Sequence, residues 1–186
     1  MKKILLILLM YLKVDVFFRK VSSLLNGVKV LRYKDRYGLN FNFIDQGGGR
    51  FDIVDPEGKF EIGLNSHIKS NTFIDATGGV KIGRYFHTGR NLTIFSSDHN
   101  YKDARKIPYD EQYKYGAVVI GDFVWFGCNV TVLPGVEIGE GVIVGANSVV
   151  TKSFSRYSII AGSPAVLIGI RDKGKFEKLK SMKCYY

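Results

Sequence analysis

Residues 118–151 read VVIGDFVWFGCNVTVLPGVEIGEGVIVGANSVVT, and this stretch repeats itself every six positions. One series of apolar residues is Ile120, Phe126, Val132, Ile138, Val144 and Val150. A second series stands two positions earlier, at Val118, Val124, Val130, Val136, Val142 and Ser148. Glycine follows the first series at positions 121, 127, 139 and 145. A period of six fits neither an α-helix, which repeats about every 3.6 residues, nor an ordinary strand, which alternates.

A three-sided coil explains this period. Each unit of six residues would form one short extended side and one corner. Alternate residues of the side then point inward, which accounts for both apolar series. Glycine would give the corner its backbone freedom. Three units close a turn of about eighteen residues, and stacked turns bury a continuous apolar column. Strands of a β-sandwich have no reason to place glycine every six residues, so the repeat predicts a parallel β-helix.

The same pattern appears earlier and sets the expected boundaries. It runs through Ile62, Ile68 and Ile74, shifts phase by two, and resumes at Ile82, Thr88 and Ile94. We therefore predict an all-β chain of one domain, residues 1–186, with a β-helix over 59–170. A polar and aromatic loop at 95–117 interrupts it. Residues 1–58 are expected to be helical and irregular, and the basic tail 171–186 to begin as a helix.

The chain carries a formal net charge of +10. Its basic residues gather near the two ends, around 19–36 and 171–183, and no nucleic-acid recognition motif is present. We expect no nucleic-acid partner. The two cysteines, Cys128 and Cys184, provide neither a disulfide framework nor zinc-ligand spacing. A reduced cytoplasmic compartment is the resulting expectation.

Residues 1–25 leave three interpretations open. Lys2 and Lys3 precede a short apolar run, but Lys13 and Asp15 end it well before the ~20 residues a bilayer requires. The segment could pack on its own domain or on a sister subunit. It could lie on an anionic membrane, which would place the protein peripherally on the inner face. A cleaved signal is the third choice, although no alanine occurs before Ala76 to form an A-x-A site.

The stretches DFVWFGCNVTVLPGVEIGEGVIVGANSVVTKS (122–153) and IIAGSPA (159–165) resemble the hexapeptide-repeat acyltransferases. The resemblance covers residues 60–170 and is to the xenobiotic, galactoside, maltose and polysaccharide O-acetyltransferase branch. It implies a left-handed β-helix, a homotrimer with sites between subunits, and acetyl-CoA as donor. The hand comes only from this resemblance, because parallel crossovers are right-handed in about 98% of cases.

The resemblance places the family's catalytic histidine on His99, within the loop sequence SSDHNY. The chemistry agrees, because acetyl transfer from a thioester to a hydroxyl needs a general base, and imidazole titrates near neutral pH. No metal is expected in this site. His67 and His87 fall at outward positions of the repeat, where we expect solvated surface residues.

The cofactor contacts also carry over from the resemblance. Cys128 takes the position opposite the pantetheine arm, and Ala146 takes the equivalent position one coil later. Thr151 and Lys152 fall where the family approaches the distal part of the cofactor, and lysine offers a mobile charge to phosphate. For Cys128, the alternative of a covalent nucleophile lacks any neighbouring base in the sequence.

This chain departs from its relatives after the AGSPA segment. Relatives often carry basic residues at two positions that Val166 and Gly169 fill here. We expect Arg171, together with Lys173, to replace them against the cofactor phosphates.

Acceptor-binding candidates surround His99. Trp125 resembles the aromatic that walls the family's site. Asp98 and Asn100 flank His99 and could orient it or contact the acceptor, but equally they could form a turn. Tyr101 belongs to a group of loop tyrosines, with Tyr109, Tyr113 and Tyr115, that could stack on a sugar or pack the loop.

The function expected from these features is acetyl transfer to a sugar hydroxyl in surface polysaccharide or glycan synthesis. One alternative is acetylation of a small soluble acceptor, such as an antibiotic or the amine of an amino sugar. Another is a non-catalytic β-helical trimer module. Zinc-dependent carbonic anhydrase fits poorly, because the histidines at 67, 87 and 99 lack the close pair that its three-histidine site needs. A nucleotidyltransferase would need a nucleotide-binding domain before residue 60.

Overall fold

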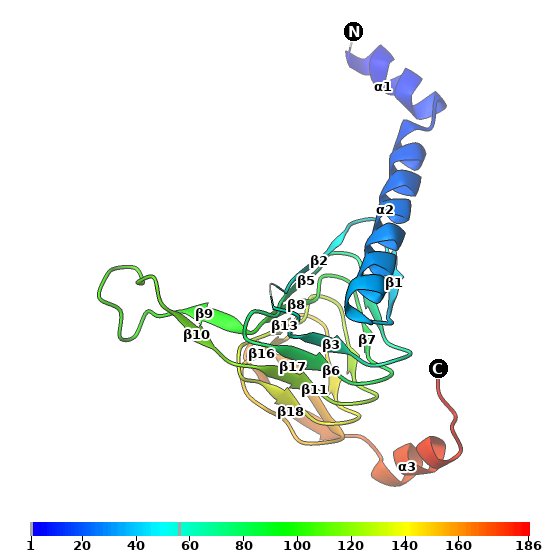
Figure 1. The fold of residues 1–186 in the computed structure, drawn as a ribbon. Helices are drawn as coiled ribbons and strands as arrows, with labels where there is room; N and C mark the ends of the chain where they lie inside the picture. Colours follow the sequence, from blue (N-terminus) through cyan, green and yellow to red (C-terminus); the bar gives the residue numbers. More distant parts are fainter. Residues whose placement is uncertain (1, 56) are drawn as a thin grey trace.

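The body of the protein is a three-sided coil of parallel strands (Figure 1). The computed structural model describes residues 2–55 and 57–186. Face A orders its strands as β1 (Asn42–Ile44), β4 (His67–Lys69), β7 (His87–Thr88), β12 (Trp125–Phe126), β15 (Ile143–Val144), β17 (Ser158–Gly162) and β18 (Ala165–Ile170). Face B contains β2 (Phe51–Val54), β5 (Thr72–Asp75), β8 (Thr93–Phe95), β13 (Thr131–Val132) and β16 (Val149–Val150). Face C contains β3 (Phe60–Ile62), β6 (Val80–Ile82), β11 (Val118–Ile120) and β14 (Glu137–Ile138).

Successive strands visit faces A, B and C in turn, which confirms the coil read from the six-residue period. Ile62, Ile82, Ile120 and Ile138 are register partners along face C. Both apolar series face inward as expected: Val132 and Val150 of the first series, and Val118, Val130 and Ser148 of the second, are fully buried. Only the last pair, β17 with β18, is antiparallel within the three faces. The stacked side chains form the core, and the outer surfaces remain free for function.

Glycine serves the coil for a reason that differs from our expectation. Gly63, Gly83, Gly121 and Gly139 stack at the corner between faces C and A, and none has a positive φ. A Cβ on any of them would lie only 2.5–2.7 Å from a backbone nitrogen of the next coil. These glycines are therefore required by close approach of the coils, not by backbone freedom.

Asparagine supplies the left-handed backbone conformation at the corner between faces A and B. Asn71, Asn91, Asn129 and Asn147 all have φ near +60°. Their side-chain amides form a continuous ladder, with N···O distances of 3.0, 2.5 and 2.8 Å. Asparagine tolerates this region of φ/ψ space better than most residues, and here each one also joins its coil to the next.

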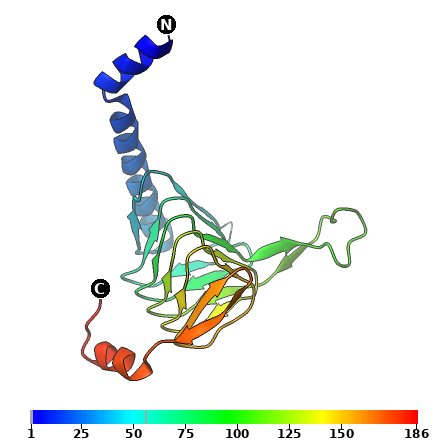
Figure 2. The same ribbon diagram turned by 180° about the vertical axis from the view of Figure 1, so that it is seen from behind.

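The coil begins earlier than the sequence pattern predicted. We expected it from residue 59, but β1 and β2 already pair in parallel with β4 and β5. Helix α2 (Val14–Tyr37) covers this first coil with its C-terminal half (Figures 1 and 2). Asn26 Nδ2 donates to the Gly49 carbonyl at 2.9 Å, and the Tyr33 hydroxyl donates to the Ile53 carbonyl at 3.0 Å. The first coil is thus sealed by a helix in place of another coil.

The N-terminal half of α2 and helix α1 (Lys2–Tyr11) project away from the body (Figure 1). Every residue from Ile4 to Leu12 is exposed, and α1 contains no buried residue. The segment therefore does not pack on its own domain. Within the described residues, no helix has both the length and the apolar character needed to cross a bilayer.

The glycine corner yields a stability prediction. Replacing Gly83 by alanine places a Cβ about 2.6 Å from the Asp122 nitrogen, and relief of that clash must shift the backbone. We expect unfolding free energy to fall by about 1–3 kcal/mol, the range of overpacking substitutions. Urea or thermal unfolding followed by circular dichroism would measure the change.

Gly27→Ala is the matched control for that experiment. It lies in α2, and a Cβ there would meet nothing within 4 Å, so helix propensity predicts unchanged or slightly increased stability. Equal stability of both variants would contradict the close-approach explanation.

Candidate active site

The loop at 95–117 forms an arm built on a two-stranded antiparallel ribbon. Strands β9 (Ser97–His99) and β10 (Tyr113–Tyr115) pair so that His99 lies opposite Tyr113. The ribbon leaves the corner between faces B and C and points away from helix α3 (Lys173–Ser181) (Figures 1 and 2). Its base is fastened by Asp75, whose carboxylate accepts from the Ser97 hydroxyl at 2.5 Å. Burial would raise the pKa of Asp75, but hydrogen bonds from Ser97 and Thr77 hold it below its usual value.

His99 is half-buried at the base of this arm and is held mainly by aromatic contacts. The Tyr109 ring stacks on the imidazole at 3.8 Å with an interplanar angle of 18°, and Tyr113 lies 4.8 Å away at 38°. The Nδ1 atom is buried and has no hydrogen-bond partner in the described part of the chain. The two tyrosines therefore restrict the orientation of the imidazole ring.

The polar neighbours of His99 stabilise the arm. The Asp98 carboxylate accepts from the His99 backbone N–H at 2.8 Å. Asn100 is buried, and its Nδ2 donates to both carboxylate oxygens of Asp110 at 3.3 and 3.1 Å. Asp110 also accepts from two arm backbone amides. Of the residues expected beside the acceptor, Asn100 is thus buried within the arm, whereas Asp98 and Tyr101 are exposed.

A row of side chains on face A forms the second half of the candidate site. His67, His87, Trp125 and Ile143 are register partners in four successive coils. The two imidazoles lie 4.2 Å apart, and burial with the neighbouring His87 and Lys69 lowers the pKa of His67 to about 4. Burial also lowers the pKa of His87. These histidines are therefore half-buried and neutral at pH 7, in contrast to the solvated residues we expected.

The row borders a groove of about 430 Å³ that extends to Cys128. Cys128 and Ala146 occupy one corner in successive coils, joined by a hydrogen bond from the Asn147 N–H to the Cys128 carbonyl at 2.9 Å. Both lie just beyond Trp125, which is 54% exposed. Cys128 and Ala146 thus lie at one edge of face A, and Trp125 lies on the adjoining strand β12.

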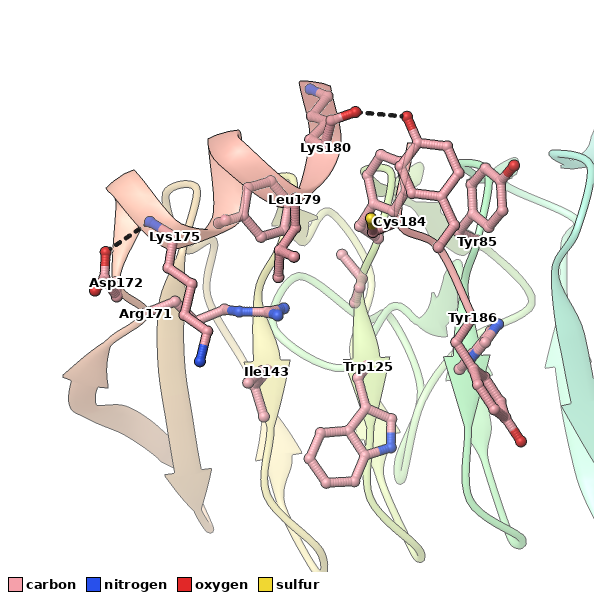
Figure 3. Close-up of a pocket in the computed structure, with 15 residues that line it drawn as sticks. Tyr85, Trp125, Ile143, Arg171, Asp172, Lys175, Leu179, Lys180, Cys184 and Tyr186 are labelled. Atoms are coloured by element: carbon pink, nitrogen blue, oxygen red, sulfur yellow. Dashed lines mark hydrogen bonds between the residues drawn. The ribbon is translucent and has the colours of Figure 1, made fainter. Parts of the chain in front are cut away.

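The other predicted cofactor residues lie elsewhere on the chain. Thr151 and Lys152 are exposed at the following corner, after β16. Arg171 follows β18 and lines a cavity of about 490 Å³ beneath α3, together with Trp125 (Figure 3). His99 borders neither this cavity nor the groove. Within one chain, the predicted residues therefore do not line a single cavity.

The sequence analysis missed the role of the C-terminal tail. Tyr85 and Phe123, one coil apart, stack at 4.9 Å and 7°, and Tyr185 packs on both at 4.7 and 5.1 Å. The tail thereby folds back over face A and closes one side of the cavity (Figure 3). Tyr85 and Phe123 both follow a repeat glycine by two positions, a signal that marks them as corner neighbours.

Comparison with known proteins agrees with the fold and the repeat. The family model described as bacterial transferase hexapeptide (six repeats) matches residues 117–152. An Escherichia coli K12 protein described as a lipopolysaccharide biosynthesis O-acetyl transferase, WbbJ, is 38% identical over 143 residues, 70% of each chain. A Lysinibacillus sphaericus protein described as a macrolide acetyltransferase is 53% identical over 62 residues, 33% of this chain and 34% of that protein.

A solved structure extends the likeness beyond the repeats. The hexapeptide-repeat acetyltransferase of Vibrio cholerae is 23% identical and superposes with a TM-score of 0.67, covering 78% of this chain and 80% of that chain. Its complex with acetyl-CoA gives a TM-score of 0.61. The repeat, the coil and the 38% identity over two thirds of the E. coli protein lead to one conclusion: the chain belongs to the hexapeptide-repeat acetyltransferases.

Proposed function

We propose that this chain transfers an acetyl group from acetyl-CoA to a hydroxyl of a sugar, in the assembly of a surface polysaccharide or another glycan. The observation that carries this proposal is the half-buried His99 imidazole, held by two tyrosines with Nδ1 unpartnered within the described chain. The similarity to WbbJ, named for lipopolysaccharide O-acetylation, supports the acceptor class. The acetyl-CoA complex of the Vibrio relative supports acetyl-CoA as the donor. Membership of the hexapeptide-repeat family supports a left-handed coil.

The geometry supports a direct transfer. His99 would take the proton of the acceptor hydroxyl as its oxygen attacks the thioester carbonyl. The C–S bond would then break, and the CoA thiolate would leave and take up the proton. Backbone amides of the coil are available to stabilise the intermediate oxyanion. Much of the rate would come from holding donor and acceptor together in one cleft.

Such a cleft requires more than one copy of the chain. The arm carrying His99 and the cavity beneath α3 lie on opposite sides of the body (Figures 1 and 2). We propose a homotrimer in which His99 of one chain meets Trp125, Cys128 and Ala146 of the next. Thr151 and Lys152 would approach the same cofactor from their own corner.

Acetylation of a small soluble acceptor is the second candidate function. The observation in its favour is the 53% identity to the L. sphaericus protein named as a macrolide acetyltransferase. That identity spans only 62 residues of this chain, and short repeat segments chiefly determine the coil. We therefore rank it below the glycan acceptor. A non-catalytic module would not require an imidazole held in a fixed orientation, so the His99 contacts argue against that alternative.

The N-terminal helices support a place for the enzyme on a membrane surface. Residues 1–25 combine the fully exposed apolar run of α1 with basic residues at Lys2, Lys3, Lys13, Arg19 and Lys20. Apolar side chains can enter the lipid boundary while the cations meet anionic headgroups. We propose a cytoplasmic enzyme held peripherally at the inner face of the membrane, where lipid-linked sugars are assembled.

Replacing His99 by alanine tests the general base. We expect kcat to fall by about 10²–10⁴-fold, because no other group would take the hydroxyl proton, while the trimer persists in analytical ultracentrifugation. Thiol release with a panel of sugar acceptors measures the activity. Lys102→Ala, an exposed change in the same arm, should leave it unchanged. Full turnover of the His99→Ala enzyme would refute the mechanism.

Mixing that variant with Ala146→Trp tests the shared site. Each variant alone should be inactive, one lacking the base and the other having a blocked cofactor groove. In randomly mixed trimers about a quarter of the interfaces combine two intact halves, so activity should return to about that level. Mixed trimers, verified by native mass spectrometry, that stay inactive would place the site within one chain.

The aromatic contact on His99 makes a separate prediction. Tyr109→Leu removes the stacked ring and should lower kcat by about 10–100-fold, because the imidazole loses its orientation, with little change in the KM for acetyl-CoA. Tyr109→Phe keeps the ring and should restore nearly full activity. A raised acceptor KM with kcat intact, in the leucine variant, would instead identify Tyr109 as an acceptor contact.

Membrane association can be measured by flotation with vesicles of phosphatidylcholine and phosphatidylglycerol. We expect the full chain to float with these vesicles, less so at high salt, and a Leu8→Asp variant to remain in solution. Ile107→Asp is the matched control, since Ile107 is 97% exposed on the distant arm. Equal flotation of all three proteins would exclude α1 as the anchor.

A further inference from the structure

The cavity beneath α3 contains two positively charged groups without ion-pair partners. Arg171 and Lys175 extend from the start of α3 over Ile143, and both of their charged ends face the sheet (Figure 3). Neither side chain makes an ion pair within the described chain. The Arg171 guanidinium donates to the Gly141 carbonyl at 3.1 Å and lies 5.0 Å from the Phe176 ring centre.

The cavity lining contains two further charged side chains. Lys180 pairs with Glu140, which lies outside the lining. The Asp172 carboxylate accepts from the Lys175 backbone N–H at 2.8 Å as the cap of α3, and its single negative charge is outnumbered by those of Arg171 and Lys175. Arg171 is half-buried, and this burial lowers the pKa of its guanidinium. The cavity is thus left with an excess of positive charge.

The remaining walls of the cavity are aromatic. Trp125 and Tyr186 border it on one side, and Tyr85, Phe123 and Tyr185 form the stacked group on another (Figure 3). Its volume of about 490 Å³ lies within the range typical of small-molecule sites. Aromatic rings beside the two unpaired cations, Arg171 and Lys175, suit a ligand that contains both a ring and a phosphate group.

The position of the cavity separates it from the donor groove. Strand β12 enters face A after Phe123, passes Trp125, and ends before the corner occupied by Cys128. Arg171 therefore lies at the edge where the strands of face A begin, whereas Cys128 and Ala146 lie at the edge where they end. Trp125 stands between the two, exposed to both.

We propose that Arg171 and Lys175 bind the phosphate of the acceptor, so that the acetylated sugar is one linked through a diphosphate. This assignment rests on the proposed function and gives Arg171 a different partner from the cofactor phosphate expected from the sequence. Arginine and lysine together offer charge-assisted hydrogen bonds to a diphosphate. Trp125 then receives the sugar between this site and the thioester.

Isothermal titration of the full-length protein tests the site without requiring turnover. The probes are three diphosphates. Inorganic pyrophosphate represents the diphosphate alone, uridine diphosphate represents a nucleotide carrier, and geranyl diphosphate represents a lipid carrier. Lys175→Met keeps the side-chain stem and should weaken binding of the probes about tenfold or more, the loss of one charge-assisted hydrogen bond. Lys178→Met, an equal charge change on the same helix, should leave binding unchanged. Tighter binding of uridine or geranyl diphosphate than of pyrophosphate identifies which carrier supplies the diphosphate.

Two results would overturn the proposal. Equal binding by the Lys175→Met and Lys178→Met proteins would show that no specific site exists. Displacement of the probes by CoA, with the CoA affinity itself reduced by Lys175→Met, would assign the cavity to the donor. Loss of turnover in the His99→Ala enzyme is independent of both results, so the proposed function and this acceptor class can fail separately.

Discussion

Successive coils of this protein approach each other so closely at one corner that no side chain can stand between them. Gly63, Gly83, Gly121 and Gly139 each lie against the backbone of the next coil. This contact sets the vertical register of the stack, and the register then determines which outward residues become neighbours. The row of His67, His87, Trp125 and Ile143 on face A exists because those coils are in step. The candidate site is therefore a product of backbone packing as much as of its own side chains.

The sequence predicted the features that depend on a short period. The inward series, the three sides and the interruption after Ile94 all follow from the six-residue repeat. The first coil escaped notice because Phe41, Phe43 and Phe51 replace its aliphatic residues, and their bulk is accommodated by α2. The prediction that the corner glycines provide backbone freedom was wrong. A positive φ and a lack of space for a side chain both favour glycine, and the sequence alone does not distinguish these two causes.

The candidate site was predictable only in part. Motif similarity proposed His99, Trp125, Cys128 and Ala146 as site residues, and the last three come together on face A. The stacking of Tyr109 and Tyr113 on His99 depends on the pairing register of the arm, which no periodic signal in that loop reveals. The cavity beneath α3 depends on contacts between residues about 100 positions apart, such as Tyr85 and Tyr185. Contacts of this kind follow from tertiary packing, so a local pattern cannot report them.

The two ends of the coil are closed in different ways. Helix α2 covers the first coil, while β18 turns back antiparallel on β17 and leads into α3. An uncovered final coil would offer open strand edges to the first coil of another molecule, and parallel stacking could continue without limit. Helix α2 covers that template at the first coil, and the reversed direction of β18 breaks the parallel pattern of face A at the last. Each change works against end-to-end growth into a filament.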